Sequence, residues 1–320
     1  MTALSNEQVR FFDENGYLII EDVIDRTSVL EPLIAEYDDL LDRLVEGWIK
    51  EGRLDKSVAT MPFDEKLVAA YAAGCDFFRP MDISLPLGDI QADSPMHTGP
   101  AVFDLLTCES LLDVASSVLG PELTSCPIQH VRMKPTQERL VGEVANSHIV
   151  ATQFHQDRAV GRAEADQAKI VTTWVAVTDA DEENGCLMAV PGSHRREMLD
   201  HCPLPQLGIP GDLFDESQAR PMPVGAGGVV LLHPLTIHGS LPNISTRMRW
   251  SFDLRYNRTG ETPGRPQFPE FIARSRSAPE TEFRDAKKWA QMWLDARARL
   301  SSAKDVAYFH RWPEDAPLCA

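Results

Sequence analysis

The chain has 320 residues, of which 43% are hydrophobic and 25% are charged, as is usual for a globular protein with one large core. Its formal net charge of −17 argues against nucleic acid as a partner, because phosphate binding needs a basic surface. No apolar run approaches the roughly 20 residues of a membrane span, and no basic or apolar leader opens the chain. We therefore expect a cytoplasmic protein with no membrane partner.

The first third of the chain is predicted to be mainly helical. Ser5 and Gln8 have the spacing of a capping box, so a short helix is expected to begin there and to end at Gly16. A strand is expected next, over residues 17–24. The spacing of apolar residues predicts further helices over 27–50, 64–74 and 106–118.

From about residue 124 to 257 the pattern changes to short strands punctuated by Gly and Pro. Helices followed by many short strands indicate a barrel or sandwich with helices packed on it. A last helix is expected over 278–304, where Trp289 and Trp293 share one face. With no internal repeat or low-complexity linker, we predict one domain over residues 1–320. Its parts are a helical segment of about 1–122, a barrel core of about 123–257 and a helical extension of about 258–320.

The tripeptide His155-Gln156-Asp157 carries the most informative pattern. In an extended strand alternate side chains point to one face, so this imidazole and this carboxylate would lie about 6–7 Å apart along the backbone. Alone the pattern is weak, because such tripeptides arise by chance. A distant histidine on a neighbouring strand, for which His238 is the best candidate, would complete a site of two His and one carboxylate. That arrangement is typical of non-haem Fe(II) oxygenases.

A predicted hairpin links His238 to a candidate anion-binding arginine. If the chain turns about residues 243–244, the returning strand places Arg249 opposite His238. Arg249 could then pair with the far carboxylate of a 2-oxo acid bound to the metal, and Ser240 could add a hydroxyl. Arg247 is the alternative arginine, and a surface hairpin with solvated arginines is the alternative interpretation.

The remaining candidates are less informative. The six cysteines have no C-x-x-C spacing, so they indicate neither a zinc site nor a redox dithiol and are expected to be free thiols. His148 is expected in a loop over the mouth of the site, where it could contact substrate. Residues 305–320 have no clear pattern.

Taken together, the motifs resemble the phytanoyl-CoA dioxygenase (PhyH) family of Fe(II)/2-oxoglutarate-dependent oxygenases. They occur over about residues 5–260. In chain order they are Gly16-Tyr17-Leu18-Ile19-Ile20, His155-Gln156-Asp157, Trp174, Glu183-Asn184-Gly185-Cys186-Leu187, Val190-Pro191-Gly192-Ser193-His194, His238-Gly239-Ser240, Asn243, Ser245, Arg249 and Arg255-Tyr256.

This resemblance implies a mainly β fold with added helices, in which N-terminal and C-terminal helices pack on a double-stranded β-helix (a jelly-roll, cupin-like core). It implies three iron ligands, which are also the catalytic residues: His155, Asp157 and His238. It implies a co-substrate pocket formed by Arg249, Ser240, Trp174 and, from the strand at 129–135, His130.

The implied reaction uses Fe(II), 2-oxoglutarate and O₂ to oxidise an unactivated C–H bond of a small acid, amino acid or natural product, with release of succinate and CO₂. Hydroxylation is the expected outcome. Halogenation is not, because related halogenases replace the carboxylate that Asp157 supplies here. One alternative is a cupin-type metalloenzyme of another chemistry, which would not need Arg249. The other is a non-catalytic family member, which would be expected to have lost a metal ligand. The sequence identifies neither the substrate nor the oligomeric state.

Overall fold

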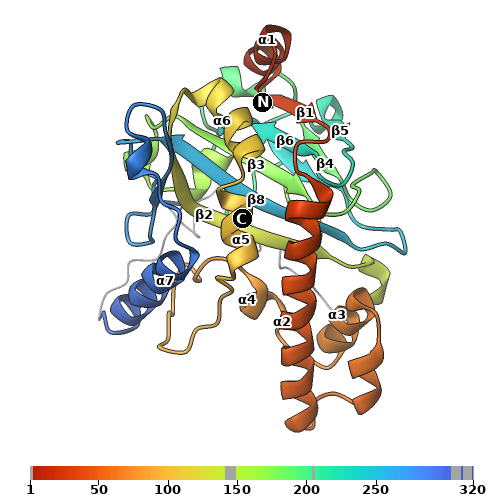
Figure 1. The fold of residues 1–320 in the computed structure, drawn as a ribbon. Helices are drawn as coiled ribbons and strands as arrows, with labels where there is room; N and C mark the ends of the chain where they lie inside the picture. Colours follow the sequence, from red (N-terminus) through yellow and green to blue (C-terminus); the bar gives the residue numbers. More distant parts are fainter. Residues whose placement is uncertain (1–2, 141–148, 204–205, 304–310, 313–318, 320) are drawn as a thin grey trace.

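The computed structural model describes residues 3–140, 149–203, 206–303, 311, 312 and 319. Two antiparallel sheets form the centre of the molecule, with strand orders β1-β6-β3-β8-β2-β9 and β5-β4-β7 (Figure 1). The strands are β1 Tyr17–Ile20, β2 Glu122–Lys134, β3 Ile170–Ala176, β4 Leu187–Ala189, β5 Arg220–Met222, β6 Val229–Leu232, β7 His238–Ser240, β8 Arg249–Arg258 and β9 Phe271–Ser275. This is the expected double-stranded β-helix with helices packed on it.

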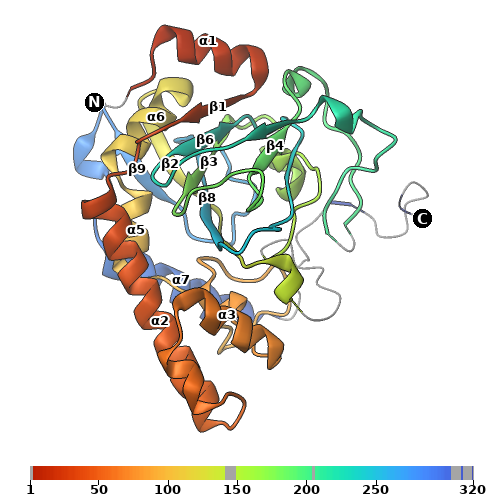
Figure 2. The same cartoon turned by 90° about the vertical axis from the view of Figure 1, so that its right-hand side faces the viewer.

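The helices pack around the larger sheet, several of them on its outer face and the first beside its β1 edge, as two perpendicular views show (Figures 1 and 2). They are α1 Asn6–Asn15, α2 Glu31–Lys50, α3 Phe63–Ala72, α4 Phe78–Met81, α5 Pro100–Leu106, α6 Glu109–Leu119 and α7 Ala286–Ser301. The capping box at Ser5 is present, and Gly16 ends α1 with a φ of 78°, in the left-handed region that glycine adopts at low cost. In the described part of the chain no helix has the length and apolar character needed to span a membrane.

Strand β8 explains how one sheet serves both the core and an interior site. Trp250, Phe252 and Leu254 belong to the large apolar core that the helices share. The alternate residues Arg249, Ser251, Asp253 and Arg255 are also buried, but they face the space between the two sheets. A strand buried on both faces, with polar groups on one of them, indicates a polar cavity inside the barrel.

The predicted hairpin between His238 and Arg249 is wrong. Strand β7 pairs with β4 in the smaller sheet, where His238 lies opposite Ala189. Strand β8 pairs with β2 and β3 in the larger sheet, where Arg249 lies opposite Lys134. The turn therefore carries the chain from one sheet to the other, which a single sequence cannot distinguish from a hairpin within one sheet.

Other expectations differ from the structure at the ends of the chain. Strand β9 adds an edge to the larger sheet within a stretch expected to be helical. Cys202 and Cys319 form a disulfide, so the expectation of free thiols is wrong for these two, whereas Cys75, Cys108, Cys126 and Cys186 are free. Their separation of 117 residues left no local signal, because only the fold brings them together.

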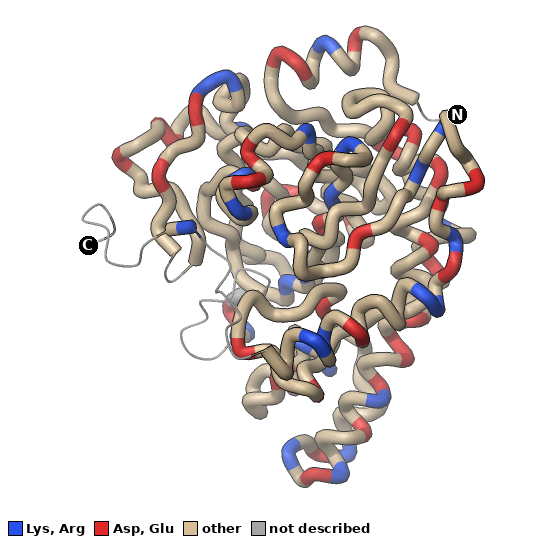
Figure 3. The backbone as a smooth tube through the Cα atoms, turned by 90° about the vertical axis from the view of Figure 1, so that its left-hand side faces the viewer, with Lys and Arg blue, Asp and Glu red and all other residues tan. Residues whose placement is uncertain are grey.

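Acidic and basic residues are interspersed along the helices and loops (Figure 3).

Candidate active site

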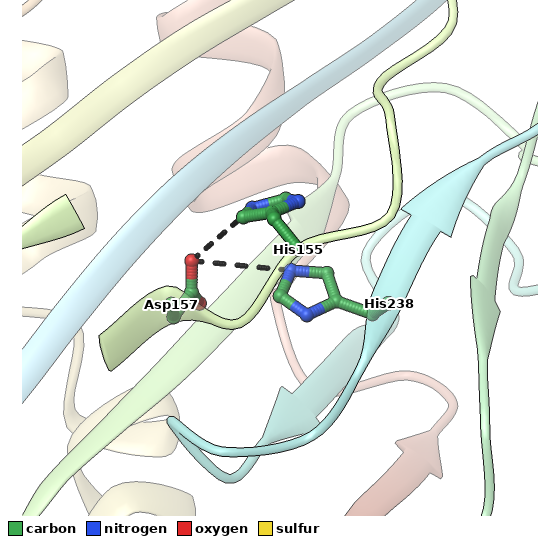
Figure 4. A group of neighbouring side chains, drawn as sticks. All are labelled: His155, Asp157 and His238. Atoms are coloured by element: carbon green, nitrogen blue, oxygen red, sulfur yellow. Dashed lines mark ion pairs between the residues drawn. The ribbon is translucent and has the colours of Figure 1, made fainter. Parts of the chain in front are cut away.

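His155, Asp157 and His238 lie together inside the barrel and are all buried (Figure 4). One possible ligand atom from each lies within 4.8 Å of the others. Asp157 Oδ1 is 3.6 Å from His155 Nε2 and 3.9 Å from His238 Nε2. Two ligand atoms bonded to one ion at about 2.1 Å are separated by roughly 3–4 Å, so the spacing fits a single metal ion.

Both imidazoles are oriented by the backbone. His155 Nδ1 is 2.9 Å from the carbonyl oxygen of Gln153, and His238 Nδ1 is 2.9 Å from that of Thr236. A carbonyl oxygen only accepts, so each Nδ1 carries the proton and each Nε2 keeps its lone pair toward Asp157. Burial, followed by the neighbouring His155, lowers the pKa of His238 to about 4. The imidazole is therefore neutral near pH 7, as metal ligation requires.

The carboxylate of Asp157 is held from two sides. Arg255 Nη2 donates to Oδ1 at 2.5 Å, and Thr172 Oγ1 donates to Oδ2 at 2.5 Å. Burial alone would raise the pKa of Asp157, but the Arg255 guanidinium and the nearby histidines hold it well below its usual range. Asp157 is therefore ionised and fixed in position. Neither Arg255 nor Thr172 was among the predicted site residues, since both come from the core-like strands β8 and β3.

The ligand-bearing segment differs from the simple strand that the sequence suggests. His155 forms a single β-bridge with His238, while Asp157 opens a 3₁₀ turn, Asp157–Val160. Gly239 allows this close approach, because a Cβ there would lie 2.9 Å from the carbonyl oxygen of Thr152. The bridge and the turn together bring the two side chains to the same ion site.

A second group of predicted residues lies beside this cluster. Arg249 is fully buried, and its Cζ lies 5.2 Å from the ring centroid of Trp174. Arg249 Nη1 donates to Ser251 Oγ, whereas its Nε and Nη2, and Trp174 Nε1, have no hydrogen-bond partner among the described residues. Burial, then the charge of Arg132, lowers the pKa of Arg249 to about 9, so it remains a cation at neutral pH. Unpaired buried donors on a cation indicate a site for an anion.

Lys134 is a further basic residue beside Arg249, which it faces across β2 and β8, and sequence reasoning did not select it. Its buried Nζ donates to Ser240 Oγ at 2.8 Å and to Thr152 Oγ1 at 2.9 Å. Burial, then Arg249, lowers the pKa of Lys134 well below its usual value. The alternation of His130, Arg132 and Lys134 on one face of β2 was the available signal.

His130, chosen from the same strand, lies in a different place from Arg249. Its Nδ1 is 3.0 Å from the carboxylate of Asp82, which is fully buried. His130 lines a second cavity of about 490 Å³, whereas Arg132, two residues along β2, lines the metal cavity. The two cavities are therefore neighbours along β2. His148 lies outside the described residues.

A double-stranded β-helix with two histidines and one carboxylate converging inside it, next to a buried arginine, defines a non-haem iron oxygenase that uses a 2-oxo acid. The phytanoyl-CoA dioxygenase (PhyH) family model matches residues 12–251, which is most of the chain. The chain belongs to the PhyH family.

Individual relatives agree with this assignment. The chain is 25% identical over 266 residues to "Phytanoyl-CoA dioxygenase 1" of Oryza sativa subsp. japonica, covering 79% of this chain and 88% of that protein. It is also 25% identical over 258 residues to "1-deoxypentalenic acid 11-beta-hydroxylase" of Streptomyces exfoliatus, covering 77% and 78%. Among solved structures, the non-haem monooxygenase ThoJ has the same fold, with a TM-score of 0.59 and 20% identity over 92% of this chain and 97% of that one.

The protein is thus an Fe(II)/2-oxoglutarate-dependent oxygenase. Its cofactor is iron, and 2-oxoglutarate and O₂ are its co-substrates.

Proposed function

We propose that this enzyme hydroxylates a C–H bond of a compact organic acid or natural product, with iron held by His155, Asp157 and His238. The observation that carries the proposal is the convergence of these three ligand atoms beside a buried arginine with two unpaired nitrogens. When bound, iron and 2-oxoglutarate supply the oxidising power: O₂ is reduced, 2-oxoglutarate becomes succinate and CO₂, and the substrate gains oxygen.

The remaining roles fall to the protein. Arg249 receives the far carboxylate of 2-oxoglutarate, with Ser240 donating its hydroxyl and Trp174 packing beside the guanidinium. We propose Lys134 as an additional hydrogen-bond donor for the same carboxylate. Arg255 and Thr172 keep Asp157 ionised and aimed at the metal, which is the usual task of residues around a metal ligand. The role of His130 in binding the co-substrate stays a prediction.

We assign the primary substrate to the cavity of about 490 Å³ that neighbours the metal cavity. Its walls are the segments 85–89 and 94–95 with Arg79 and His130, and its volume suits a compact ligand. Among the described residues, Arg79 is the one Lys or Arg that lines it. Coenzyme A esters carry several phosphates, which a single arginine and a chain of net charge −17 are poorly suited to bind. A compact acid is favoured over an acyl-CoA.

The first test is an anaerobic titration with Fe(II), with and without 2-oxoglutarate, that follows the visible metal-to-ligand charge-transfer band. The band is expected with the wild-type protein and not with Asp157→Ala, and Arg249→Ala should need much more 2-oxoglutarate to produce it. A folded, iron-loaded wild-type protein without the band would refute the proposed roles.

A positive result leads to a substrate screen by succinate release. Free acids and natural products are expected to stimulate it, and the matching CoA thioesters are not. Stimulation by thioesters alone would contradict the substrate class.

A cytoplasmic location also stays a prediction. The Cys202–Cys319 disulfide bears against it, because thiols are kept reduced there.

A further inference from the structure

The described residues near the C-terminus contact the turn that follows the metal ligand Asp157. Arg311 donates through Nη2 to the carbonyl oxygen of Arg158 at 2.8 Å and through Nε to that of Gly161 at 3.2 Å. Trp312 Nε1 donates to the carbonyl oxygen of Ala159 at 3.1 Å. Three carbonyls within five residues of Asp157 are thus bound by two residues about 150 positions further along the chain.

Arg311 is itself fixed by a carboxylate in the same loop. Its two terminal nitrogens each lie 2.7 Å from an oxygen of Asp166, in a two-point pair. Planar pairs of this kind define direction as well as distance. The guanidinium therefore links Asp166, at one end of the loop 158–166, to the carbonyls of Arg158 and Gly161. It fixes the two parts of this loop relative to each other.

A second contact of the C-terminal residues acts through His201 on Gln156, the residue between the ligands His155 and Asp157. The ring of Trp312 lies 5.0 Å from the ring of His201, which is almost fully buried. His201 Nδ1 is 2.8 Å from the carbonyl oxygen of Leu199, so its Nε2 accepts the backbone N–H of Gln156 at 2.9 Å. Gln156 stands between His155 and Asp157. Trp312 thus contacts the ligand segment directly at Ala159 and, through His201, at Gln156.

The disulfide ties the same two regions covalently. Cys202 follows His201 directly, and its partner Cys319 is near the C-terminus. A covalent link across 117 residues reduces the freedom of the chain far more than a local contact would. All these C-terminal contacts come from residues beyond 251, where the match to the family model ends.

We propose that Arg311, Trp312 and the Cys202–Cys319 disulfide form a C-terminal clasp that positions the iron ligands. Arg311 and Trp312 are positioning residues: they touch neither metal nor substrate, and they act by holding residues 156–161. The proposal rests on the assignment of iron to His155, Asp157 and His238. Residues that orient metal ligands typically change metal affinity 10–100-fold when altered.

The test compares Arg311→Gln, Trp312→Ala and Cys319→Ser in the full-length protein. The matched control is Arg26→Gln. Arg26 is exposed, and its ion pair with Glu31 lies near the start of the sequence, far along the chain from residues 156–162. The first measurement is hydrogen exchange of the metal-free protein at residues 156–162, where the N–H of Arg158 bonds to the carbonyl oxygen of Pro234. The second is the Fe(II) dissociation constant by equilibrium dialysis.

Arg311→Gln and Trp312→Ala are expected to speed exchange in this loop and to weaken Fe(II) binding about tenfold, with kcat at saturating iron little changed. Cys319→Ser should produce smaller changes of the same sign, and Arg26→Gln none. If Trp312→Ala does not fold, Trp312→Phe keeps the ring against His201 and removes the Nε1 donor, so a smaller loss is expected.

Folded variants with wild-type exchange and wild-type iron affinity would overturn the clasp. Iron binding to wild-type protein without a 2-oxoglutarate band would instead count against the proposed function. The exchange measurement needs no metal, so the two failures are distinguishable.

Discussion

The two ends of the interior cavity differ in how their polar groups are paired. At the metal end, the carboxylate of Asp157 has two donors, and both histidines have a carbonyl partner at Nδ1. At the other end, to which we assign the co-substrate, Arg249 keeps two buried nitrogens without a partner among the described residues. At the first end three ligand atoms converge. At the second end a buried cation has two nitrogens that can donate hydrogen bonds to a bound anion.

This difference has an energetic consequence. An unpaired buried charge costs several kcal/mol, whereas a carboxylate that is paired and hydrogen-bonded is far less costly. We therefore expect the metal end to be ordered in the free protein. The co-substrate end should gain stability when 2-oxoglutarate binds, because the bound anion completes the hydrogen bonds of Arg249.

The largest effect is expected at the co-substrate end. Arg249→Gln removes the charge but keeps a polar side chain, and should raise the KM for 2-oxoglutarate about 100-fold, the effect of losing a charge-assisted pair of about 3 kcal/mol. Fe(II) affinity without 2-oxoglutarate should stay within a few-fold of wild type. A large loss of iron binding would show that the two ends are not separable.

The corresponding substitution at the metal end is Arg255→Gln. It removes the charge beside Asp157, and we expect Fe(II) affinity to fall at least tenfold while the KM for 2-oxoglutarate at saturating iron changes little. Arg255→Lys keeps the charge and should recover part of the affinity. Equal effects of Gln and Lys would mean that shape, rather than charge, is what Arg255 contributes.

A smaller effect is expected for Lys134→Met, which keeps the length of the side chain. Loss of this buried amine should raise the KM for 2-oxoglutarate by a few-fold to tenfold, less than the loss of Arg249. Thermal unfolding of the metal-free protein is the control, because a methionine of similar length should fill the same buried space without destabilising the fold. An unchanged KM would limit Lys134 to supporting Ser240.

The smallest expected effect is the dependence of the free energy of unfolding on pH. Burial lowers the pKa of His201 to about 3 and those of His233 and His238 to about 4, whereas unfolded histidine titrates near 6.5. Between these values the unfolded chain binds protons that the folded chain does not, so stability falls as pH falls. Each histidine contributes up to about 1.4 kcal/mol per pH unit within this window.

Urea unfolding of the metal-free protein at pH 7, 6 and 5 checks this sign. The free energy of unfolding should decrease over the series, and His233→Asn should reduce the slope. Stability that is constant or increases toward pH 5 would contradict the neutral, buried state of these residues.

The sequence by itself determined the helices that have clear caps, the buried strands and the three converging residues to which we assign the metal. Capping at Ser5 and apolar alternation are local properties, so a single chain reveals them. The H-x-D pattern and the spacing from His238 to Arg249 also lie in the chain and carry the family resemblance. They identified residues that the fold then brought together.

The tertiary structure alone decided which strands are neighbours. It placed His238 and Arg249 in different sheets, put Lys134 opposite Arg249, and brought Arg255 to Asp157. It also joined Cys202 to Cys319. These contacts link residues far apart in the chain, and their energy comes from burial and pairing that exist only after the sheets close. No local pattern encodes them, because strand alternation fixes which face a side chain occupies and leaves open what lies across from it.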